Sequence, residues 1–366
     1  MVSKKSQWAL VVLITMCIGA EVAVRLALRF FPVAGTRVAD YKEFLGECRD
    51  APYYNHPYLP YFDAGTRIHA HGLSARGEEY SFHRAPAGFR IVCLGGSTTA
   101  GCEPEQPAYP RLLAQLLRDH AQDLKIEVVN LGVAGWNSAD SLVAAALWLG
   151  HLQPDVVTVH HGFNDINPRL MAEYVPDLSS YRTRIGGYRW SLLERLAAHS
   201  SLAALVLVGA AGEVSLLDTY MVRPESRFTD DTGKGPERGV TFERNLRAIV
   251  ALARGCGAVA VVATMPYHPD IPYEFGGSDA LLSQHNETGR RVAREAGAVL
   301  VDMDREMTGR HACFRDRIHV DQEGHAMKAR LLYDAIVDYL PDTSPARTAD
   351  RAMGGDLPSA PQHQRR

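Results

Sequence analysis

The fold of this chain is decided by the stretch Arg90-Ile91-Val92-Cys93-Leu94-Gly95-Gly96-Ser97-Thr98-Thr99. Its first half is a short apolar run that ends at glycine, which is typical of a strand buried on both faces of a parallel sheet. Ser97 follows directly, so the predicted strand ends at a serine on a turn. A serine in this position can be presented as a nucleophile, although a serine after Gly-Gly is often only a turn residue.

The chain after residue 90 alternates between predicted strands and predicted helices. Strands are expected at residues 90–94, 126–130, 155–159, 258–263 and 299–301. Helices are expected at residues 109–120, 138–149, 242–254, 279–296 and 322–339. This alternation predicts an α/β fold in which a five-stranded parallel sheet lies between two layers of helices, a three-layer sandwich.

A second polar motif lies near the C-terminal end, where the chain reads Asp316-Arg317-Ile318-His319. Residues three apart can meet locally, so the Asp316 carboxylate can reach the His319 ring and fix its tautomer. Together with Ser97, this pair indicates a serine hydrolase whose acid and base share one loop. A competing interpretation is that Asp316 only caps the last helix and that Asp302 or Asp304, otherwise expected to cap a turn, supports His319.

Two further segments run from a predicted strand into a turn. Residues 128–137 pass into a turn at Gly135, and residues 156–165 end in a turn that contains Asn164. A backbone N–H at Gly135 and the side-chain amide of Asn164 are suitable donors for a developing oxyanion. Because both turns follow parallel strands, we expect them at the same sheet edge as Ser97, where open α/β sheets bind ligands.

In this order, the four segments resemble the sequence blocks of the SGNH (GDSL-type) hydrolase family over residues 88–340. Ser97 matches the block I serine, Gly135 the block II glycine, Asn164 the block III asparagine, and Asp316 with His319 the block V Asp-x-x-His. The resemblance implies a flavodoxin-like SGNH hydrolase fold and cleavage of carboxylic esters without a metal or organic cofactor. It also implies an oxyanion site formed by the N–H groups of Ser97 and Gly135 and by the Asn164 amide.

One position departs from the family pattern. The first block of the family usually reads Gly-Asp-Ser, whereas this chain has Gly96 in place of the aspartate. That aspartate is not a member of the catalytic triad, so we expect the chemistry to survive. The departure bears on the local loop geometry and on the fit of the substrate.

Two other functional classes share the same residues. An O-acyltransferase would use the same serine but give the acyl group to a sugar hydroxyl instead of water. A non-catalytic envelope protein would keep the fold for binding or assembly, and the intact set of Ser97, Asn164, Asp316 and His319 argues against it. For a hydrolase, short acyl esters such as O-acetyl groups on cell-envelope glycans or lipids are the expected substrates.

The composition limits the remaining possibilities. With 366 residues, of which 46% are hydrophobic, the chain can bury a sizeable core. A formal net charge of −3 gives no general electrostatic basis for binding nucleic acid. Six cysteines without Cys-x-x-Cys spacing argue against a zinc knuckle or a thioredoxin-type site. Cys93 is expected to be a buried apolar residue, and Cys48 and Cys102 could form a disulfide if the domain is exported.

The N-terminus indicates export. Lys4 and Lys5 precede an apolar run from Trp8 to Ala20, which is short for a spanning helix. A second apolar stretch, ending at Phe31, is interrupted by Glu21, Arg25 and Arg29. An uncleaved signal anchor over residues 1–32 is favoured, because the apolar helical periodicity continues and the arginines can snorkel to the interface. A cleaved signal peptide and a soluble amphipathic helix are the alternatives. With the lysines inside, the catalytic domain would be membrane-anchored and extracytoplasmic, either periplasmic or extracellular.

Three segments lie outside the regular alternation. Residues 33–89 are expected to form a lead-in with short strands before the hydrolase domain at residues 90–340. Residues 165–240 form an insertion, with expected helices at 190–196 and 202–208 and an exposed loop at 230–238. The insertion is either a cap over the substrate groove, a plain surface excursion or a second membrane-facing patch. The tail at residues 341–366 is expected to be disordered.

Several other kinds of site are excluded by spacing. The glycine-rich turn after the first strand lacks the Gly-Lys-Ser/Thr of a phosphate loop and the Gly-x-Gly-x-x-Gly of a dinucleotide site. Thr99 stands where the Gly-x-Ser-x-Gly of α/β-hydrolases requires glycine. His160 and His161 are adjacent on a strand and point to opposite faces, and His319 and His325 lack a zinc-type spacing.

Overall fold

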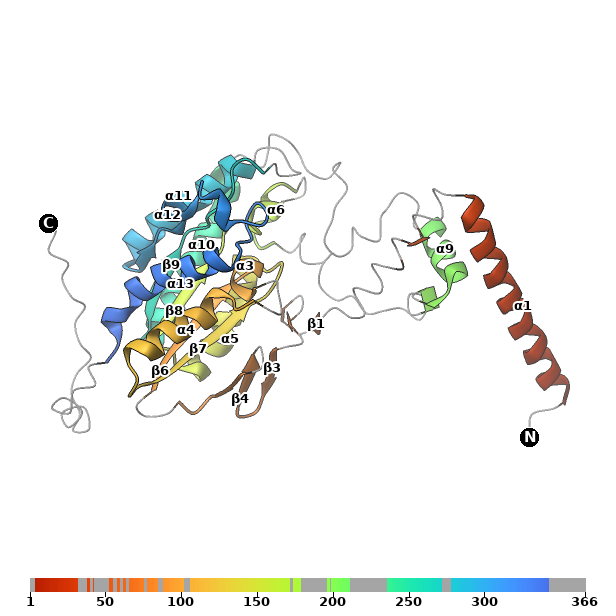
Figure 1. Cartoon of the computed structure of the whole chain (residues 1–366), viewed down its shortest axis with the longest axis horizontal. Coiled ribbons are helices and arrows are strands. Elements are labelled where there is room, and N and C mark those ends of the chain that lie inside the picture. Colours follow the sequence, from red (N-terminus) through yellow and green to blue (C-terminus); the bar gives the residue numbers. More distant parts are fainter. Residues whose placement is uncertain are drawn as a thin grey trace. The chain divides into compact units, whose positions relative to one another are not determined.

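The structure is a computed structural model that describes residues 4–31, 38–39, 42, 53–54, 58–59, 62–63, 66–75, 78–84, 88–101, 106–171, 174–178, 196–197, 199–210, 236–271 and 278–341. The chain divides into two compact units. One comprises residues 66–166 and 242–366, and the other comprises residues 1–65 and 167–241. The first is the hydrolase unit, and the second contains the N-terminal helix (Figure 1).

A five-stranded sheet forms the centre of the hydrolase unit. Its strands are all parallel and lie in the order β10-β9-β8-β6-β7. Their bounds are β6 Gly88–Gly95, β7 Lys125–Gly132, β8 Val156–His160, β9 Val259–Ala263 and β10 Val299–Val301. The strands are apolar and β-branched, and β6 and β8 are buried along their full length, as sheets covered on both faces require. The predicted parallel sheet is therefore confirmed.

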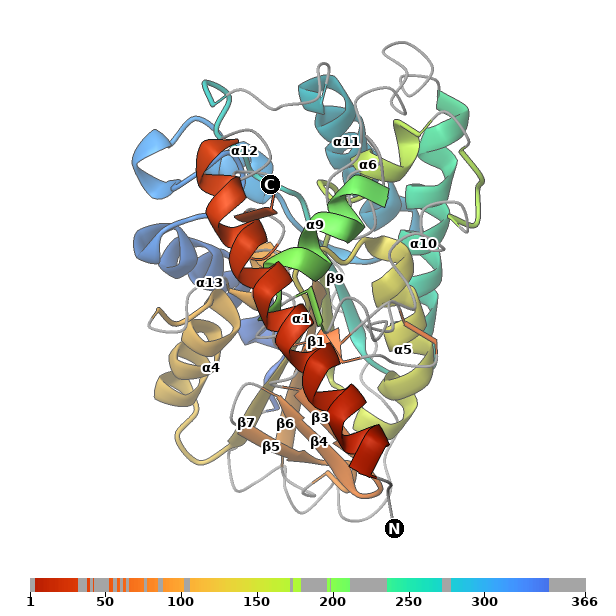
Figure 2. The ribbon, with the colours of Figure 1, turned by 90° about the vertical axis from the view of Figure 1, so that its right-hand side faces the viewer.

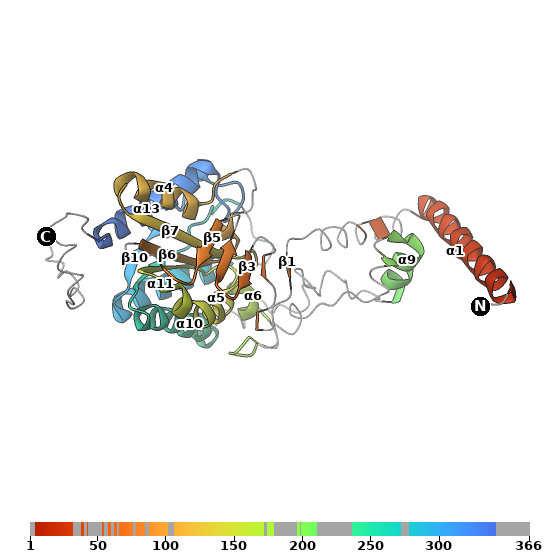
Figure 3. The same ribbon diagram turned by 90° about the horizontal axis from the view of Figure 1, so that it is seen from below.

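Helices cover both faces of this sheet. Helices α4 (Tyr109–His120) and α13 (Gln322–Ile336) lie on one face, and α5 (Ser138–Leu152), α10 (Pro236–Gly255) and α11 (Ser278–Ala296) lie on the other (Figures 2 and 3). Shorter helical turns are α3 (Ser97–Ala100), α6 (Ile166–Arg169), α12 (Met303–Met307), η4 (His311–Cys313) and η5 (Val337–Tyr339). The result is the three-layer α/β sandwich that the alternation predicts.

Local sequence signals fix where these helices begin. Asn137 caps α5 in a capping box with Asp140. The Asn137 side chain accepts a hydrogen bond from the Asp140 backbone amide, and the Asp140 carboxylate accepts one from the Asn137 backbone amide. Asp321 caps α13 by accepting from the Gly324 N–H at 2.9 Å. The cap of α13 is thus Asp321, and Asp316 is left for another role.

The strand register brings three turns to one edge of the sheet. Gly95 at the end of β6 pairs with Gly132 of β7 on one side and with His160 of β8 on the other. The segments that follow these strands therefore leave the sheet together. Ser97, the turn at Gly135 and the turn at Asn164 all emerge at this edge, as expected for a ligand-binding edge of an α/β sheet.

The remaining described strands are short. A three-stranded antiparallel sheet, β3 (Thr66–His69), β4 (Gly72–Ala75) and β5 (Glu78–Ser81), belongs to the hydrolase unit. Its Tyr80 hydroxyl donates to the Val128 carbonyl of β7 at 2.8 Å, which ties it to the main sheet. The strands β1 (Tyr53–Tyr54) and β2 (Phe62–Asp63) pair in the other unit. The short strands expected between residues 33 and 89 are therefore present.

The second unit contains helices α1 (Lys4–Phe30) and α9 (Ser201–Ala210). Within α1, the 24 residues Gln7–Phe30 are long and apolar enough to cross a membrane, and none of the most apolar window is buried by the protein. Helix α9 extends the helix expected at residues 202–208. The N-terminal part of the helix expected at residues 190–196, the Cys48 and Cys102 pair and the tail beyond residue 341 lie outside the described residues.

One expectation for the insertion is wrong in part. Residues 236–238, expected within an exposed loop, form the first turn of α10 instead. Arg238 explains the difference, because its guanidinium donates to the carbonyls of Arg169 and Met171 at 2.6 and 2.7 Å. Arg238, which the sequence pattern places in a loop, therefore stabilises the first turn of α10.

Candidate active site

Ser97 begins the helical turn α3, directly after β6 and two glycines. The first glycine is required by space: a Cβ on Gly95 would lie 2.1 Å from the Thr99 Oγ1 and 3.0 Å from the His160 carbonyl. The turn is closed by backbone bonds from Thr99 N and Ala100 N to the Gly96 carbonyl, at 3.0 and 2.9 Å. This tight turn holds the serine at the sheet edge.

The structure brings His319 to Ser97 across 222 residues of sequence. The Ser97 Oγ and the His319 Nε2 are 2.8 Å apart, which is within hydrogen-bond distance. The other ring nitrogen, Nδ1, lies 2.6 Å from Asp316 Oδ2. The three predicted residues thus form a continuous chain of hydrogen bonds from hydroxyl to imidazole to carboxylate.

Asp316 and His319 belong to one closed loop. The loop is pinned by a bridge between Phe314 and Val320 and by a bond from Arg315 N to the His319 carbonyl at 2.9 Å. The second carboxylate oxygen of Asp316 accepts from the backbone amides of Ile318 and His319, at 2.9 and 2.8 Å. Because both oxygens are engaged, the carboxylate cannot rotate away from the ring.

These contacts also set the protonation state of the acid. Partial burial acts to raise the pKa of Asp316, but the hydrogen bonds from the His319 ring and from the amides of His319 and Ile318 outweigh it and lower the pKa to about 2. The carboxylate is therefore ionised at neutral pH. An ionised carboxylate at Nδ1 favours the tautomer in which Nε2 is free to accept the serine proton.

The competing acids lie elsewhere. Asp302 caps α12 by accepting from the Arg305 amide, as the sequence predicts. The Arg290 guanidinium donates to Asp302 at 2.7 and 2.8 Å and to Asp304 at 2.8 Å. Both carboxylates are thus neutralised by an arginine rather than directed to His319. The imidazole of His319 instead contacts Asp316 through Nδ1 and Ser97 through Nε2.

The two predicted oxyanion donors come from neighbouring turns. Gly135 has a φ of +77°, a conformation in which glycine carries no Cβ penalty. The Asn164 amide nitrogen donates to the carbonyl of Trp136, the next residue, at 2.8 Å. This bond couples the turn after β8 to the turn after β7. Asn164 is also close to the serine turn, because a Cβ on Gly96 would lie 2.8 Å from its Nδ2.

A buried polar network that sequence reasoning missed supports the Asn164 turn. Asp165 is buried and accepts from the Ser138 backbone amide at 3.1 Å and from the Ser138 hydroxyl at 2.5 Å. Asn245 of α10 then donates to the same hydroxyl at 3.0 Å. Burial raises the pKa of Asp165 to about 7, against the lowering effect of the Ser138 bonds. The sequence offered one indication of this network, which was the acidic residue Asp165 directly after Asn164.

The two adjacent histidines do face opposite sides of the sheet. The His160 ring meets the edge of the Tyr109 ring of α4, with centroids 6.1 Å apart. The His161 Nε2 lies 2.7 Å from the Ser141 hydroxyl of α5, on the other face. Burial lowers the pKa of His161 to about 3, so its ring is neutral. The predicted orientation of the two side chains to opposite faces is confirmed.

Two hollows flank Ser97. The first lies beside the serine and the imidazole and is lined by Ser97, Thr98, Gln106, Arg315, His319, Val320 and His325. The second lies beside the Asn164 turn and is lined by Gly96, Ser97, Thr98, His161, Gly162, Phe163, Asn164, Met265 and Ile318. Burial and the nearby Lys328 lower the pKa of His325 to about 4, so it lines the first hollow as a neutral ring.

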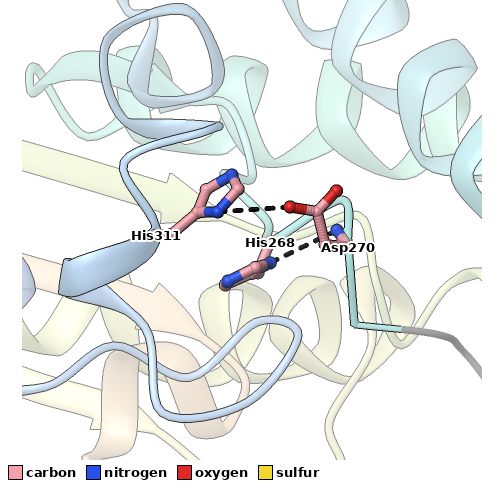
Figure 4. Close-up of side chains that lie close together, drawn as sticks. All are labelled: His268, Asp270 and His311. Atoms are coloured by element: carbon pink, nitrogen blue, oxygen red, sulfur yellow. Dashed lines mark hydrogen bonds and ion pairs between the residues drawn. The ribbon is translucent and has the colours of Figure 1, made fainter.

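Among the described residues, one group of donors for a metal lies on the flank of the acid–base loop. It consists of His268, Asp270 and His311, whose ligand atoms lie within 4.8 Å of one another (Figure 4). His311 Nδ1 pairs with Asp270 Oδ2 at 3.2 Å, and the His268 amide donates to the Arg317 carbonyl at 2.8 Å. The rings of His268 and His311 also pack with centroids 4.2 Å apart, so the cluster joins the loop after β9 to η4.

A family model described as the GDSL-like lipase/acylhydrolase family matches residues 93–327. The chain belongs to this family. The match spans Ser97, the turns at Gly135 and Asn164 and the loop with Asp316 and His319, and it identifies the protein as an ester hydrolase. No curated protein matches the sequence.

Solved structures with a similar fold include two enzymes. Axe2, an acetylxylan esterase from Geobacillus stearothermophilus, is 18% identical with a TM-score of 0.42, over 70% of this chain and 100% of that one. LAE5, an alpha/beta hydrolase enzyme from the metagenome of Lake Arreo, Spain, is 20% identical with a TM-score of 0.41, over 71% of this chain and 99% of that one. At these identities the likeness concerns the fold alone.

Proposed function

We propose that the protein cleaves esters by a Ser-His-Asp mechanism. The observation that carries this proposal is the unbroken relay from the Ser97 Oγ through His319 to Asp316, with bonds of 2.8 and 2.6 Å. His319 takes the serine proton as Ser97 attacks the ester carbonyl, and later gives it to the leaving alcohol. Asp316 stabilises the imidazolium that forms in between.

The oxyanion of the tetrahedral intermediate is held, in this proposal, by the N–H groups of Ser97 and Gly135 and by the Asn164 amide. Support comes from the shared sheet edge and from the bond between Asn164 Nδ2 and the Trp136 carbonyl, which fixes the amide beside Gly135. Water then attacks the acyl-serine, with His319 acting as the base. No step requires a group that the chain itself does not supply.

The two hollows indicate which parts of the substrate lie where. The hollow beside the Asn164 turn includes Phe163, Met265 and Ile318, and these apolar side chains suit a short acyl chain. The hollow beside the imidazole includes Gln106, Arg315 and His325, whose polar groups suit the hydroxyl-rich alcohol portion of the ester. This division supports short O-acyl groups on envelope glycans or lipids as the substrate class.

We also place the enzyme at a membrane, with α1 as a retained anchor and the hydrolase unit outside the cytoplasm. Its support is the span Gln7–Phe30 together with Lys4 and Lys5 on the N-terminal side. A reporter fused after residue 340 that is active only outside the cytoplasm should be active. Recovery of the full chain in the soluble cytoplasmic fraction would contradict this placement.

The catalytic proposal is tested by labelling with a fluorophosphonate probe, which reacts with activated serines. The wild-type protein should be labelled, and Ser97→Ala should not be. Release of free acid from an O-acetylated glycan, measured against acyl transfer to an added glycan, separates a hydrolase from an acyltransferase with the same serine. Labelling that survives in Ser97→Ala would overturn the assignment of the nucleophile.

A further inference from the structure

Helix α9 is apolar along its whole length, yet much of it is not buried. After Ser201, its sequence LAALVLVGA contains no charged or hydrogen-bonding side chain. Between residues 201 and 208 only Ser201 and Ala204 are buried, and Val206 is 52% exposed. A helix that is apolar all round belongs in a protein core or in a membrane. Within the part of the chain that the structure describes, protein covers only one side of α9, so the outward side needs another apolar cover.

The N-terminus of α9 is satisfied without water. The backbone N–H groups of Ser201 and Leu202 donate to the Glu21 carboxylate at 2.8 and 2.9 Å. The Ala203 N–H donates to the Ser200 hydroxyl oxygen at 3.1 Å, and the Ser200 N–H, at the N-cap, donates to the Leu196 carbonyl at 2.8 Å. These are the four donors that a helix leaves open. In hydrocarbon each open donor would cost several kcal/mol, so this complete set is what a bilayer requires.

Glu21 makes these bonds from within the candidate membrane span of α1. An acid inside such a span is costly and is retained only with partners. Its partners here are the N-terminus of α9, the Ser200 hydroxyl at 2.7 Å and Arg25 at 2.7 Å. Glu21 lies nine residues before Phe30, about 14 Å along the helix from the C-terminal end of the span. The Glu21 carboxylate therefore sets the position along α1 at which α9 begins.

The two helices also share an apolar contact. Leu28 of α1 packs against a buried cluster that consists of Ala204, which belongs to α9, and of Val38 and Ala197, which lie outside it. Figures 1 and 3 show α9 beside the C-terminal half of α1. The exposed face of α9 is thus continuous with the segment of α1 that is suited to lipid.

We propose that α9 is a second membrane-embedded element, a ten-residue helix that enters the bilayer beside the C-terminal half of α1 without crossing it. At about 15 Å it reaches half of a hydrocarbon core of about 30 Å. Lipid acyl chains cover its outward face. The inference rests on the proposed insertion of α1, and it requires that α1 stays attached, because removal of α1 would remove the cap of α9.

The test places a fluorophore at three apolar positions of the full chain, one at a time, in a background with its six native cysteines replaced. The positions are Leu13 of α1, Val206 of α9 and Leu300 of β10, which are 58%, 52% and 39% exposed. Each Leu→Cys or Val→Cys variant is labelled and reconstituted into phosphatidylcholine vesicles, with and without nitroxide lipid. Labels at 13 and 206 should lose at least about half of their emission to the nitroxide lipid, since contact quenching needs acyl chains against the label. The label at 300 should lose far less.

A matched pair of α1 variants tests the role of the acid. Glu21→Ala should weaken the quenching at 206 while the quenching at 13 persists. Thr15→Ala is the control, because the Thr15 hydroxyl donates within α1 to the Val11 carbonyl, and it should change neither signal. Ester hydrolysis by each variant reports that the chain is folded.

The outcomes separate the two proposals. Quenching at 13 but not at 206 would overturn the embedding of α9 and leave the insertion of α1 standing. Quenching at neither position would overturn both. Quenching at 206 that is unchanged in Glu21→Ala would show that the cap does not hold α9 in the bilayer.

Discussion

Gly96 offers the sharpest test of the proposed oxyanion site, because a single methyl group at this position would meet the Asn164 amide. A Cβ on Gly96 would lie 2.8 Å from Nδ2, whereas ordinary contacts begin at 3.4 Å. The amide nitrogen must therefore move by about 0.6 Å in Gly96→Ala, the difference between these distances. The backbone is not strained by the change, since Gly96 has a φ of −90°.

The size of the effect follows from two limits. Complete loss of one oxyanion donor costs about 10²–10³ in kcat. A misplacement of about 1 Å in an active site can cost about 10²-fold, so a shift of about 0.6 Å should cost roughly 10-fold or more. We expect Gly96→Ala to lower kcat by about 10- to 100-fold and Asn164→Ala by about 10²–10³, with smaller changes in KM. Thermal stability should fall slightly, because the added Cβ would also lie 3.1 Å from the backbone carbonyl of Trp136.

The assay is hydrolysis of p-nitrophenyl acetate by Gly96→Ala, Asn164→Ala and the double variant. The double variant should be no slower than Asn164→Ala, since both changes act on one amide. Gly150→Ala is the matched control, because a Cβ there meets nothing within 4 Å. It should keep kcat and add up to about 1 kcal/mol of helix stability. Full kcat in Gly96→Ala, or multiplicative losses in the double variant, would refute the reasoning.

Three further predictions concern the hydroxyl–imidazole–carboxylate relay. Ser97→Ala should abolish ester hydrolysis and leave the far-UV circular dichroism unchanged, and unaltered turnover would sink the nucleophile assignment. Asp316→Asn should lower kcat by about 10⁴, as loss of the tautomer does in a comparable triad, while Asp302→Asn and Asp304→Asn should cost only a few-fold; a larger loss at either of the latter would favour the competing acid. Because the folded-state pKa of Asp316 is lowered to about 2, its contribution to stability is present above its unfolded value and is lost as pH falls from about 4 to 2. Acid titrations of unfolding should therefore show a steeper loss below pH 4 for the wild-type protein than for Asp316→Asn.

The sequence was sufficient for the parts of the fold that depend on local pattern. The strand at Val299–Val301 and the helix at Tyr109–His120 agree residue by residue, because short apolar runs and helical periodicity define them. The α10 start was missed, because Arg238 is held by carbonyls almost 70 residues away. A tertiary contact of that kind leaves no local signal.

The candidate site also contains some contacts that local sequence predicts and others that depend on tertiary packing. Asp316 and His319 are three residues apart, so their meeting follows from local geometry. The approach of Ser97 to His319 across 222 residues depends on tertiary packing, and the sequence could indicate it only through the chemistry of the residues and the family resemblance. The Ser138–Asp165 network and the contact of Glu21 with α9 join residues 27 and about 180 positions apart. Such pairs depend on how helices pack on a sheet or on each other, which no single segment encodes.

The closed loop between Phe314 and Val320 makes the spacing of acid and base a property of seven residues of backbone. The bridge joins the ends of the loop, so a residue inserted inside it would change the separation of carboxylate and imidazole, while one inserted outside would move them as a rigid pair. Insertional scanning of this region should therefore show an abrupt boundary of tolerance at the bridge. Because the bridge closes the loop on itself, residues 314–320 could be exchanged as one unit between related proteins without changes to the sheet that presents Ser97.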